Sequence, residues 1–163
     1  MFRAGILTVS DKGAAGERRD ASGPELTRLL EQHGFQVTHT GVVPDVWEDI
    51  VNTLTAWSDV ERLDLILTTG GTGLTPRDLT PEATLAVAHR LVPGLPEAMR
   101  AASLAKTPHA MLSRGVAVIR GATLIVNLPG SPRGARENLA AILPALPHAL
   151  EKLQGSPEEC GTA

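Results

Sequence analysis

The run Leu63–Thr69 (LDLILTT) constrains the fold of this chain more than any other segment. It is nearly all apolar, which is typical of a central parallel strand covered by helices on both faces. A glycine-rich loop, Gly70–Asp78, follows it. Thr80-Pro81-Glu82 then has the residues of a helix amino terminus, with Thr80 as the N-cap and proline at the first helical position. A buried strand, a glycine-rich turn and a helix in this order predict an α/β protein.

The rest of the chain alternates in the same way. Apolar, β-capable runs predict strands at 2–9, 35–43, 63–69, 116–119 and 123–126, and amphipathic segments predict the helices. The last two strands are close enough to form a hairpin. The expected order is β-α-β-α-β-α-α-β-β-α. It predicts a three-layer α/β/α fold with a mostly parallel five-stranded sheet and one antiparallel strand.

Polar residues indicate where the other helices begin. Ser22 and Asp45 are each followed three residues later by a glutamate, so each is the first residue of a candidate capping box. Ser131 precedes a proline and predicts the start of a last helix, which two further prolines interrupt. The polar segment 13–20 is typical of an exposed loop.

The composition bears on partners and location. The net charge is −3 and the pI about 5.9, so no basic face dominates, which argues against nucleic acid as a partner. The chain has two Trp, two Phe and no Tyr, too few for stacking bases. The apolar amino-terminal run is too short for a signal sequence or a membrane span, and Cys160 has no cysteine partner. We expect a cytoplasmic protein with one domain, 1–153, and a disordered tail, 154–163.

Three polar loops follow predicted strands: Ser10-Asp11, Gly70–Asp78 and Asn127–Ser131. Ligands of open α/β sheets bind outside the carboxyl ends of the strands, where these loops lie. The glycines of the middle loop, followed by a helix amino terminus, favour a phosphate or pyrophosphate ligand. The alternative is a turn that needs glycine only for its positive φ. The P-loop, G-x-G-x-x-G and G-x-S-x-G motifs are all missing from the sequence.

Carboxylates are the stronger candidates for chemistry. Asp11, Asp45 and Asp78 each follow a predicted strand and are expected on one rim of the sheet. Asp78 ends the glycine-rich loop, where a Mg²⁺-bound polyphosphate needs an oxygen ligand. The alternative for Asp45 and Asp78 is that they only favour helix amino termini electrostatically. The five histidines are scattered and form no metal-ligand pair.

Six segments of the sequence carry a resemblance to a known family. In chain order they read VSDKGAAGERRDASGPEL, VPD, LILTTGGTGLTPRDLTPEAT, PGLPEAMR, TPHAMLSR and RGATLIVNLPGSPRGARE. They resemble the molybdenum cofactor biosynthesis family, specifically the molybdopterin adenylyltransferases of the MogA/MoaB type and the amino-terminal domain of gephyrin. The resemblance runs from Phe2 to about Leu150. TTGGTG-x-x-x-RD-x-TPEAT together with NLPGSP makes it highly specific.

This resemblance implies a function. The expected reaction is Mg-ATP-dependent adenylylation of molybdopterin with release of pyrophosphate, before a partner enzyme inserts molybdate. The catalytic residues that it implies are Asp45, in VPD, and Asp78, in PRD, with Asp78 as the Mg²⁺ ligand. The substrate-binding residues that it implies are Ser10, Asp11, Gly70, Gly71, Thr72, Gly73, Thr80, Pro81, Glu82, Asn127, Pro129, Gly130 and Ser131.

The resemblance also implies a homotrimer. Small and apolar residues in the carboxyl-terminal half support an interface, because exposed apolar surface tends to mark one. They are Ala101, Ala102, Leu104, Ala105, Leu143, Ala145 and Leu146. Two other functions stay open: a molybdopterin-binding or scaffold protein without catalysis, and a nucleotide-processing hydrolase. The presence of both Asp45 and Asp78 favours activity, and NLPGSP with the single-domain length favours the adenylyltransferase.

Overall fold

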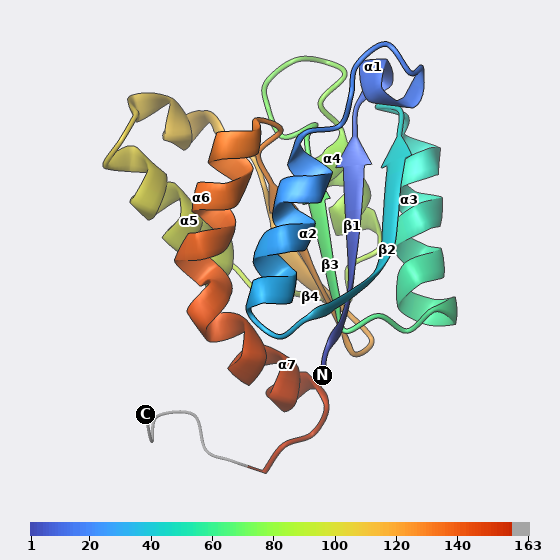
Figure 1. Cartoon of the computed structure of the whole chain (residues 1–163), viewed down its shortest axis with the longest axis vertical. Coiled ribbons are helices and arrows are strands. Elements are labelled where there is room, and N and C mark those ends of the chain that lie inside the picture. The colour runs from blue at the N-terminus through green and yellow to red at the C-terminus, as the bar shows by residue number, and fades with distance from the viewer. Residues whose placement is uncertain (158–163) are drawn as a thin grey trace.

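The computed structural model describes residues 1–157, and over this range one open sheet carries helices on both faces (Figure 1). The strands are β1 (Arg3–Val9), β2 (Gln36–Val43), β3 (Leu65–Thr69), β4 (Arg90–Leu91), β5 (Ala117–Arg120) and β6 (Thr123–Leu128). The α-helices are α1 (Asp11–Ala14), α2 (Ser22–Gln32), α3 (Trp47–Thr55), α4 (Thr80–Ala86), α5 (Gly94–Leu104), α6 (Pro132–Ile142) and α7 (Leu146–Leu153). A π-helical turn, η1 (Ala56–Val60), and two 3₁₀ turns, η2 (Pro108–Leu112) and η3 (Leu143–Ala145), complete the described elements.

The strands lie in the order β2-β1-β3-β6-β5-β4. β2, β1, β3 and β6 pair in parallel, whereas β5 pairs antiparallel with both β6 and β4. The expected three-layer fold is therefore confirmed, and so is the hairpin of β5 and β6. The described sheet has six strands where five were expected. The additional strand, β4, has two exposed residues, too few to leave a strand pattern in the sequence.

Each face of the sheet has its own apolar core. On one face α2, α5, α6 and α7 pack against the strands, through residues such as Leu26 and Leu139. On the other face α3 and α4 do the same, through residues such as Ile50 and Ala83. All five residues of β3 are buried, as expected for a central strand. Burying each large aliphatic side chain contributes about 1.5–3 kcal/mol, so the two cores hold the strand ends in fixed positions.

Three of the predicted helix caps are wrong. At α2 the cap is Asp20, whose Oδ1 accepts hydrogen bonds from the N–H groups of Ser22 and Gly23 at 3.1 and 3.0 Å. α3 begins at Trp47 without a side-chain cap, so Asp45 does not cap it. At α4 Thr80 is already helical and its hydroxyl donates to the carbonyl of Gly70 at 2.9 Å. In each case the side chain that the sequence spacing predicts as a helix cap makes a tertiary hydrogen bond instead.

Two other helix predictions have opposite outcomes. Ser131 does cap α6, accepting from the N–H of Gly134 at 3.1 Å. The segment 13–20 is not all loop, because the four-residue helix α1 reaches Ala14. Of the predicted tail 154–163, residues 158–163, with Cys160, lie outside the described residues. No helix within residues 1–157 is long and apolar enough to cross a membrane.

Candidate active site

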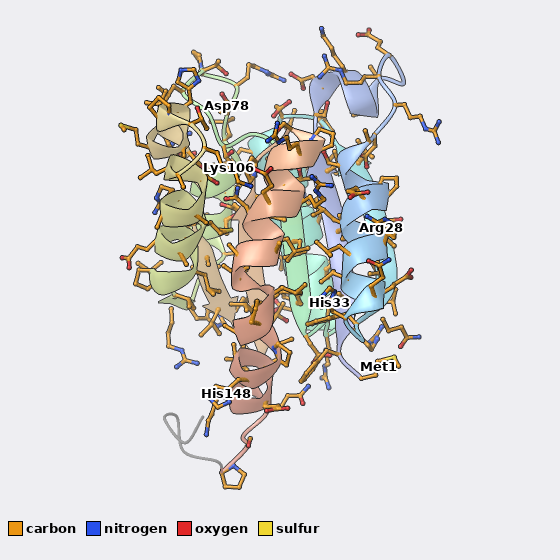
Figure 2. The ribbon with its side chains drawn as sticks, turned by 60° about the vertical axis from the view of Figure 1, so that its left-hand side comes forward. Met1, Arg28, His33, Asp78, Lys106 and His148 are labelled. Atoms are coloured by element: carbon orange, nitrogen blue, oxygen red, sulfur yellow. The ribbon has the colours of Figure 1, made fainter. Side chains whose placement is uncertain are left out.

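The parallel strands end at one edge of the sheet, where most of the predicted site residues meet. In Figure 1 the arrowheads of β1 and β2 point to this edge, above which α1 lies. Figure 2 shows Asp78 at the same end of the molecule, opposite Met1 and His148. Gly70 and Gly130 come close together here, since a Cβ added to Gly130 would lie 3.2 Å from the Cα of Gly70. Two differently charged regions share this edge.

The first region, which we call the hydroxyl pocket, is a cavity of about 500 Å³. Its lining residues are Thr8, Val9, Ser10, Gly13, Arg18, Arg19, Asp20, Ala21, Ser22, Thr69, Gly70, Gly130, Ser131 and Pro132. The side chains of Arg18 and Arg19 are exposed and have no ion pair or hydrogen bond among residues 1–157. A pocket of hydroxyls with two free guanidinium groups suits an anionic, hydrogen-bonding ligand.

Asp20 organises the wall of this pocket and is itself fully engaged. Its Oδ2 accepts from the hydroxyl of Thr8 at 2.8 Å, and its Oδ1 caps α2. The hydroxyl of Ser22 in turn donates to the carbonyl of Gly130 at 3.0 Å, so α2 is tied to the loop before α6. These bonds fix the polar groups of the pocket before any ligand binds.

The second region, which we call the acidic rim, consists of Asp11, Asp45 and Asp78 with Arg77. Asp11 and Asp45 bond each other reciprocally: each backbone N–H donates to the other's carboxylate at 2.9 Å. Arg77 donates to the carboxylate of Asp11 through Nε at 3.0 Å and Nη2 at 2.7 Å. The hydrogen bond from Arg77, aided by that from the Asp45 N–H, holds the pKa of the Asp11 carboxyl below its usual value.

Asp45 differs from Asp11 in its electrostatics. Burial raises the pKa of the Asp45 carboxyl above its ordinary value, and the charges of Asp11 and Asp78 act in the same direction. The hydrogen bond from the Asp11 N–H opposes this shift. Because Asp45 caps no helix, the alternative that the sequence left open for it loses its main support. A carboxylate held in an unfavourable environment is typical of a functional site.

Asp78 is positioned by its own loop. Its Oδ2 accepts from the N–H of Thr75 at 2.9 Å and from the Thr75 hydroxyl at 2.7 Å. A Cβ at position 73 would lie 2.9 Å from the same oxygen, so the loop needs Gly73 for this approach. The turn presents a carboxylate at the rim, near Asp45, rather than one that caps α4.

Gly70 and Gly71 form the wall between the two regions. Both have positive φ, 98° and 67°. The Thr80 hydroxyl bonds the Gly70 carbonyl, and the Thr80 N–H donates to the Gly71 carbonyl at 3.1 Å. A Cβ at Gly71 would overlap the Thr80 hydroxyl and lie 3.3 Å from Asp45 Oδ1. The positive φ of both glycines and the close approach of Gly71 to Thr80 account for glycine at these two positions, as the second interpretation expects.

Several predicted binding residues make contacts within the fold. Asn127 is buried, and its amide donates to the hydroxyls of Thr68 and Thr84 at 2.9 Å each, so it does not line the hydroxyl pocket. Thr80 and Pro81 are buried as well. Thr72, Pro129 and Glu82 complete this group: Thr72 and Pro129 give backbone carbonyls to Arg114 and Thr69, and Glu82 forms an ion pair with Arg114.

The structure thus brings together two subsets of the predicted residues. Ser10, Gly70, Gly130 and Ser131 line the hydroxyl pocket. Asp11, Asp45 and Asp78 lie on the acidic rim, with Gly71 and Gly73 beneath them.

Sequence reasoning had not assigned Thr8, Arg18, Arg19, Asp20, Ser22 and Thr69 to the site. The adjacent pair Arg18-Arg19, in the loop after the first strand, was a usable signal. The hydroxyls within strands carry no such signal, because their role depends on tertiary packing.

The rim also offers ligands for a metal ion. Carboxylate oxygens suit Mg²⁺, which binds proteins through one or two carboxylates and takes its other ligands from water and substrate phosphates. Asp45 and Asp78 meet this requirement. Among residues 1–157, no group of three or more His, Cys, Asp or Glu side chains is arranged to hold a metal ion.

Known proteins share this architecture. Residues 5–148 match the family described as "Probable molybdopterin binding domain". MoaB of Thermus thermophilus, described as a molybdopterin biosynthesis enzyme, is 57% identical and superposes with a TM-score of 0.91, covering 98% of this chain and 100% of that one. The molybdopterin adenylyltransferase of Haemophilus influenzae is 41% identical in an alignment that covers 95% of this chain and 86% of that protein.

Gephyrin of Dictyostelium discoideum is 44% identical to this chain over the aligned region. The match covers 94% of this chain and 23% of gephyrin, so the chain corresponds to less than a quarter of that protein. With a family match across nearly the whole sheet and relatives matched over most of their length, this chain belongs to the molybdopterin-binding family of molybdenum cofactor biosynthesis proteins.

Proposed function

We propose that this chain adenylylates molybdopterin: it transfers the AMP of ATP to molybdopterin and releases pyrophosphate. The observation that carries the proposal is the acidic rim beside the hydroxyl pocket, across the wall of Gly70 and Gly71. One region offers metal-binding carboxylates and the other offers anion-binding groups. Relatives named molybdopterin adenylyltransferase, from Haemophilus influenzae and Escherichia coli, are 41% and 42% identical to this chain.

The reaction is an in-line displacement at phosphorus. A phosphate oxygen of molybdopterin attacks the α-phosphorus of ATP and forms a new P–O bond. The bond from the α-phosphorus to the bridging oxygen breaks, and pyrophosphate leaves with the electron pair. Since the nucleophile is already an anion, no strong general base is needed. Catalysis then depends on positioning and on stabilising charge.

The two regions divide the substrates. Molybdopterin would enter the hydroxyl pocket, where Arg18 and Arg19 can neutralise its phosphate and the hydroxyls can bond its polar groups. The polyphosphate of ATP would lie over the glycine-rich loop next to Asp45 and Asp78. Gly70 lies between the hydroxyl pocket and the acidic rim, so the attacking oxygen and the α-phosphorus would meet beside Gly70.

Mg²⁺ fits the rim by the chemistry of its donors. Asp78, with Asp45, would hold the ion, which when bound neutralises charge on the polyphosphate. Burial disfavours the ionised form of Asp45, and a cation bound at the rim would favour it by electrostatic attraction. Arg77 holds Asp11 and keeps that carboxylate occupied.

We also propose a homotrimer in the cytoplasm that passes its product to a molybdate-inserting enzyme. The structure revises the sequence argument for the trimer, because Leu143 and Leu146 are buried in the chain's own core. Leu104, on α5, is exposed and so remains available for an interface. Light scattering at micromolar concentration tests this: a trimer has three times the 17.1 kDa mass, and a monomer contradicts it.

The test of activity is pyrophosphate release from Mg-ATP with and without molybdopterin. We expect release only when molybdopterin is present, in equal amount with adenylyl-molybdopterin. Molybdopterin binding without release of pyrophosphate would contradict the proposal in favour of a binding or scaffold protein. Consumption of ATP at the same rate without molybdopterin would contradict it in favour of a nucleotide-processing hydrolase.

A further inference from the structure

Arg114 bonds three residues of the glycine-rich loop, and one residue of α4, from outside the loop. Its Nε donates to the carbonyl of Gly73 at 2.7 Å, and its Nη2 donates to the carbonyl of Asp78 at 2.6 Å. Its Nη1 pairs with the carboxylate of Glu82, and its backbone N–H donates to the carbonyl of Thr72 at 3.0 Å. One side chain therefore bonds the loop at Gly73 and again at Asp78.

The segment that carries Arg114 is fixed in turn by a second arginine. Arg100, on α5, donates through Nη1 to the carbonyls of Ser113 and Gly115 at 3.3 and 3.0 Å. These two residues flank Arg114 in the chain. Since α5 packs in the core through Met99, the position of Arg114 is anchored to the body of the domain.

Apart from Arg114, the loop is bonded to its surroundings by Thr80 at its start and by the exposed ion pair of Arg77 with Asp11. Thr75, Pro76 and Arg77 are exposed, and the bonds within the loop run mainly between Thr75 and Asp78. Those bonds shape the turn but do not fix it to the sheet. The planar guanidinium of Arg114 can donate to several acceptors at once, whereas a lysine ammonium in its place would be a single flexible point charge.

We propose that Arg114 is a positioning residue for the reaction, acting through Asp78: it sets where the Asp78 carboxylate stands at the acidic rim. This inference rests on the proposed function. The Arg114–Glu82 pair agrees with it, since the hydrogen bond from Arg114 holds the pKa of the Glu82 carboxyl below its usual value and keeps both groups charged.

The chain offers a matched control for Arg114. Arg120, at the end of β5, donates to Asp59 through Nε and Nη2 at 3.0 and 2.6 Å and to the carbonyl of Val87 at 3.0 Å. It is an arginine with the same kinds of acceptor, a carboxylate and a carbonyl, but none of them belongs to the glycine-rich loop. Loss of general stability should therefore be similar in R114K and R120K.

The first measurement is steady-state kinetics of pyrophosphate release. R114K should lower kcat by about 10²-fold, as expected for a displaced catalytic group, with the KM for molybdopterin unchanged within about twofold. R120K should leave both constants unchanged. A kcat for R114K equal to that of R120K would overturn the proposal.

The second measurement is a double-mutant cycle with D78N. If Arg114 acts through Asp78, the D78N/R114K variant should be no slower than D78N alone. Fold losses in kcat that multiply instead would show that Arg114 acts independently of Asp78, and would overturn the positioning role.

Amide hydrogen exchange of residues 71–79 tests the contact without any turnover. Exchange should be faster in R114K than in wild type and R120K, because the loop loses the guanidinium bonds to the carbonyls of Gly73 and Asp78. Equal exchange in all three proteins would contradict the inference. If wild type released no pyrophosphate, the proposed function would fail, and this readout would still decide whether Arg114 fixes the loop.

Discussion

The hydroxyl pocket and the acidic rim share one wall, but opposite electrostatics surround them. In the pocket, the one carboxylate, Asp20, is engaged in the fold, and two arginines are left free. At the rim, the arginine is engaged with Asp11, and Asp45 is left with a raised pKa. In the proposed function, each region binds a ligand of opposite charge: an anion in the pocket and a cation at the rim.

Removing the charge of Asp78 should have the largest effect on the rim. D78N keeps the size of the side chain, so turnover should fall by about 10²-fold or more while the melting temperature changes little. Pyrophosphate release at saturating Mg²⁺ measures this. D59N is the control, because the Asp59 carboxylate is also held by hydrogen bonds, from Arg120, but lies outside the acidic rim. Near-normal turnover of D78N would remove Asp78 from the chemistry.

Removing the charge of Asp45 should separate chemistry from stability. D45N should lower turnover by about 10-fold or more, yet be at least as stable as wild type at neutral pH, because burial disfavours the ionised form. A raised native pKa means that the native state binds more protons than the unfolded state as Asp45 titrates. Wild-type stability relative to D45N should therefore fall as the pH rises from 3.8 through the native pKa.

D11N is the control for this stability measurement. Wild-type stability relative to D11N should rise with pH, whereas wild-type stability relative to D45N should fall. The native pKa of Asp11 is lowered by Arg77, so its ionised form favours folding above pH 3.8, and that contribution is lost as the pH falls through the native value. Urea unfolding of the three proteins between pH 3 and 7 compares them. D45N less stable than wild type at neutral pH would contradict the account of Asp45.

The wall between the two regions is tested at Gly71. G71A should lower the free energy of unfolding by about 1–3 kcal/mol, since φ is 67° and the new Cβ would overlap the Thr80 hydroxyl. G16A is the control: φ is 74°, but nothing lies within 4 Å of its added Cβ. Equal losses in the two variants would mean that backbone strain alone, and not the contact with Thr80, limits position 71.

The smallest effect is expected at the pocket's helix cap. S131A should cost about 1 kcal/mol of stability, because the N–H of Gly134 loses its acceptor at the start of α6. S131N can still cap and should restore most of the loss. Thermal unfolding measures both variants, and a stable S131A would show that the cap contributes little.

The sequence predicted the two regions unequally. Asp11, Asp45 and Asp78 could be placed at one edge because each follows a strand, and strand order in a parallel sheet decides which loops meet. The walls of the hydroxyl pocket could not be predicted this way. Thr8 and Ser22 each depend on one tertiary hydrogen bond, Thr8 to Asp20 and Ser22 to the carbonyl of Gly130.

The same limit explains the wrong helix caps. Spacing alone predicts Asp45 and Thr80 as helix caps. In the structure Asp45 accepts a hydrogen bond from Asp11, and Thr80 donates one to the carbonyl of Gly70. Local patterns assign a polar side chain to its nearest backbone donor. The folded chain offers such a side chain other hydrogen-bond partners, and at this site those tertiary partners determine its role.

The most direct test of the division between pocket and rim is equilibrium binding of molybdopterin without ATP and Mg²⁺. The R18S/R19S variant should bind molybdopterin about 10-fold more weakly than wild type, because its phosphate loses two cationic partners. The D45N/D78N variant should bind it no more weakly than wild type. Unchanged binding in R18S/R19S with weakened binding in D45N/D78N would contradict the account.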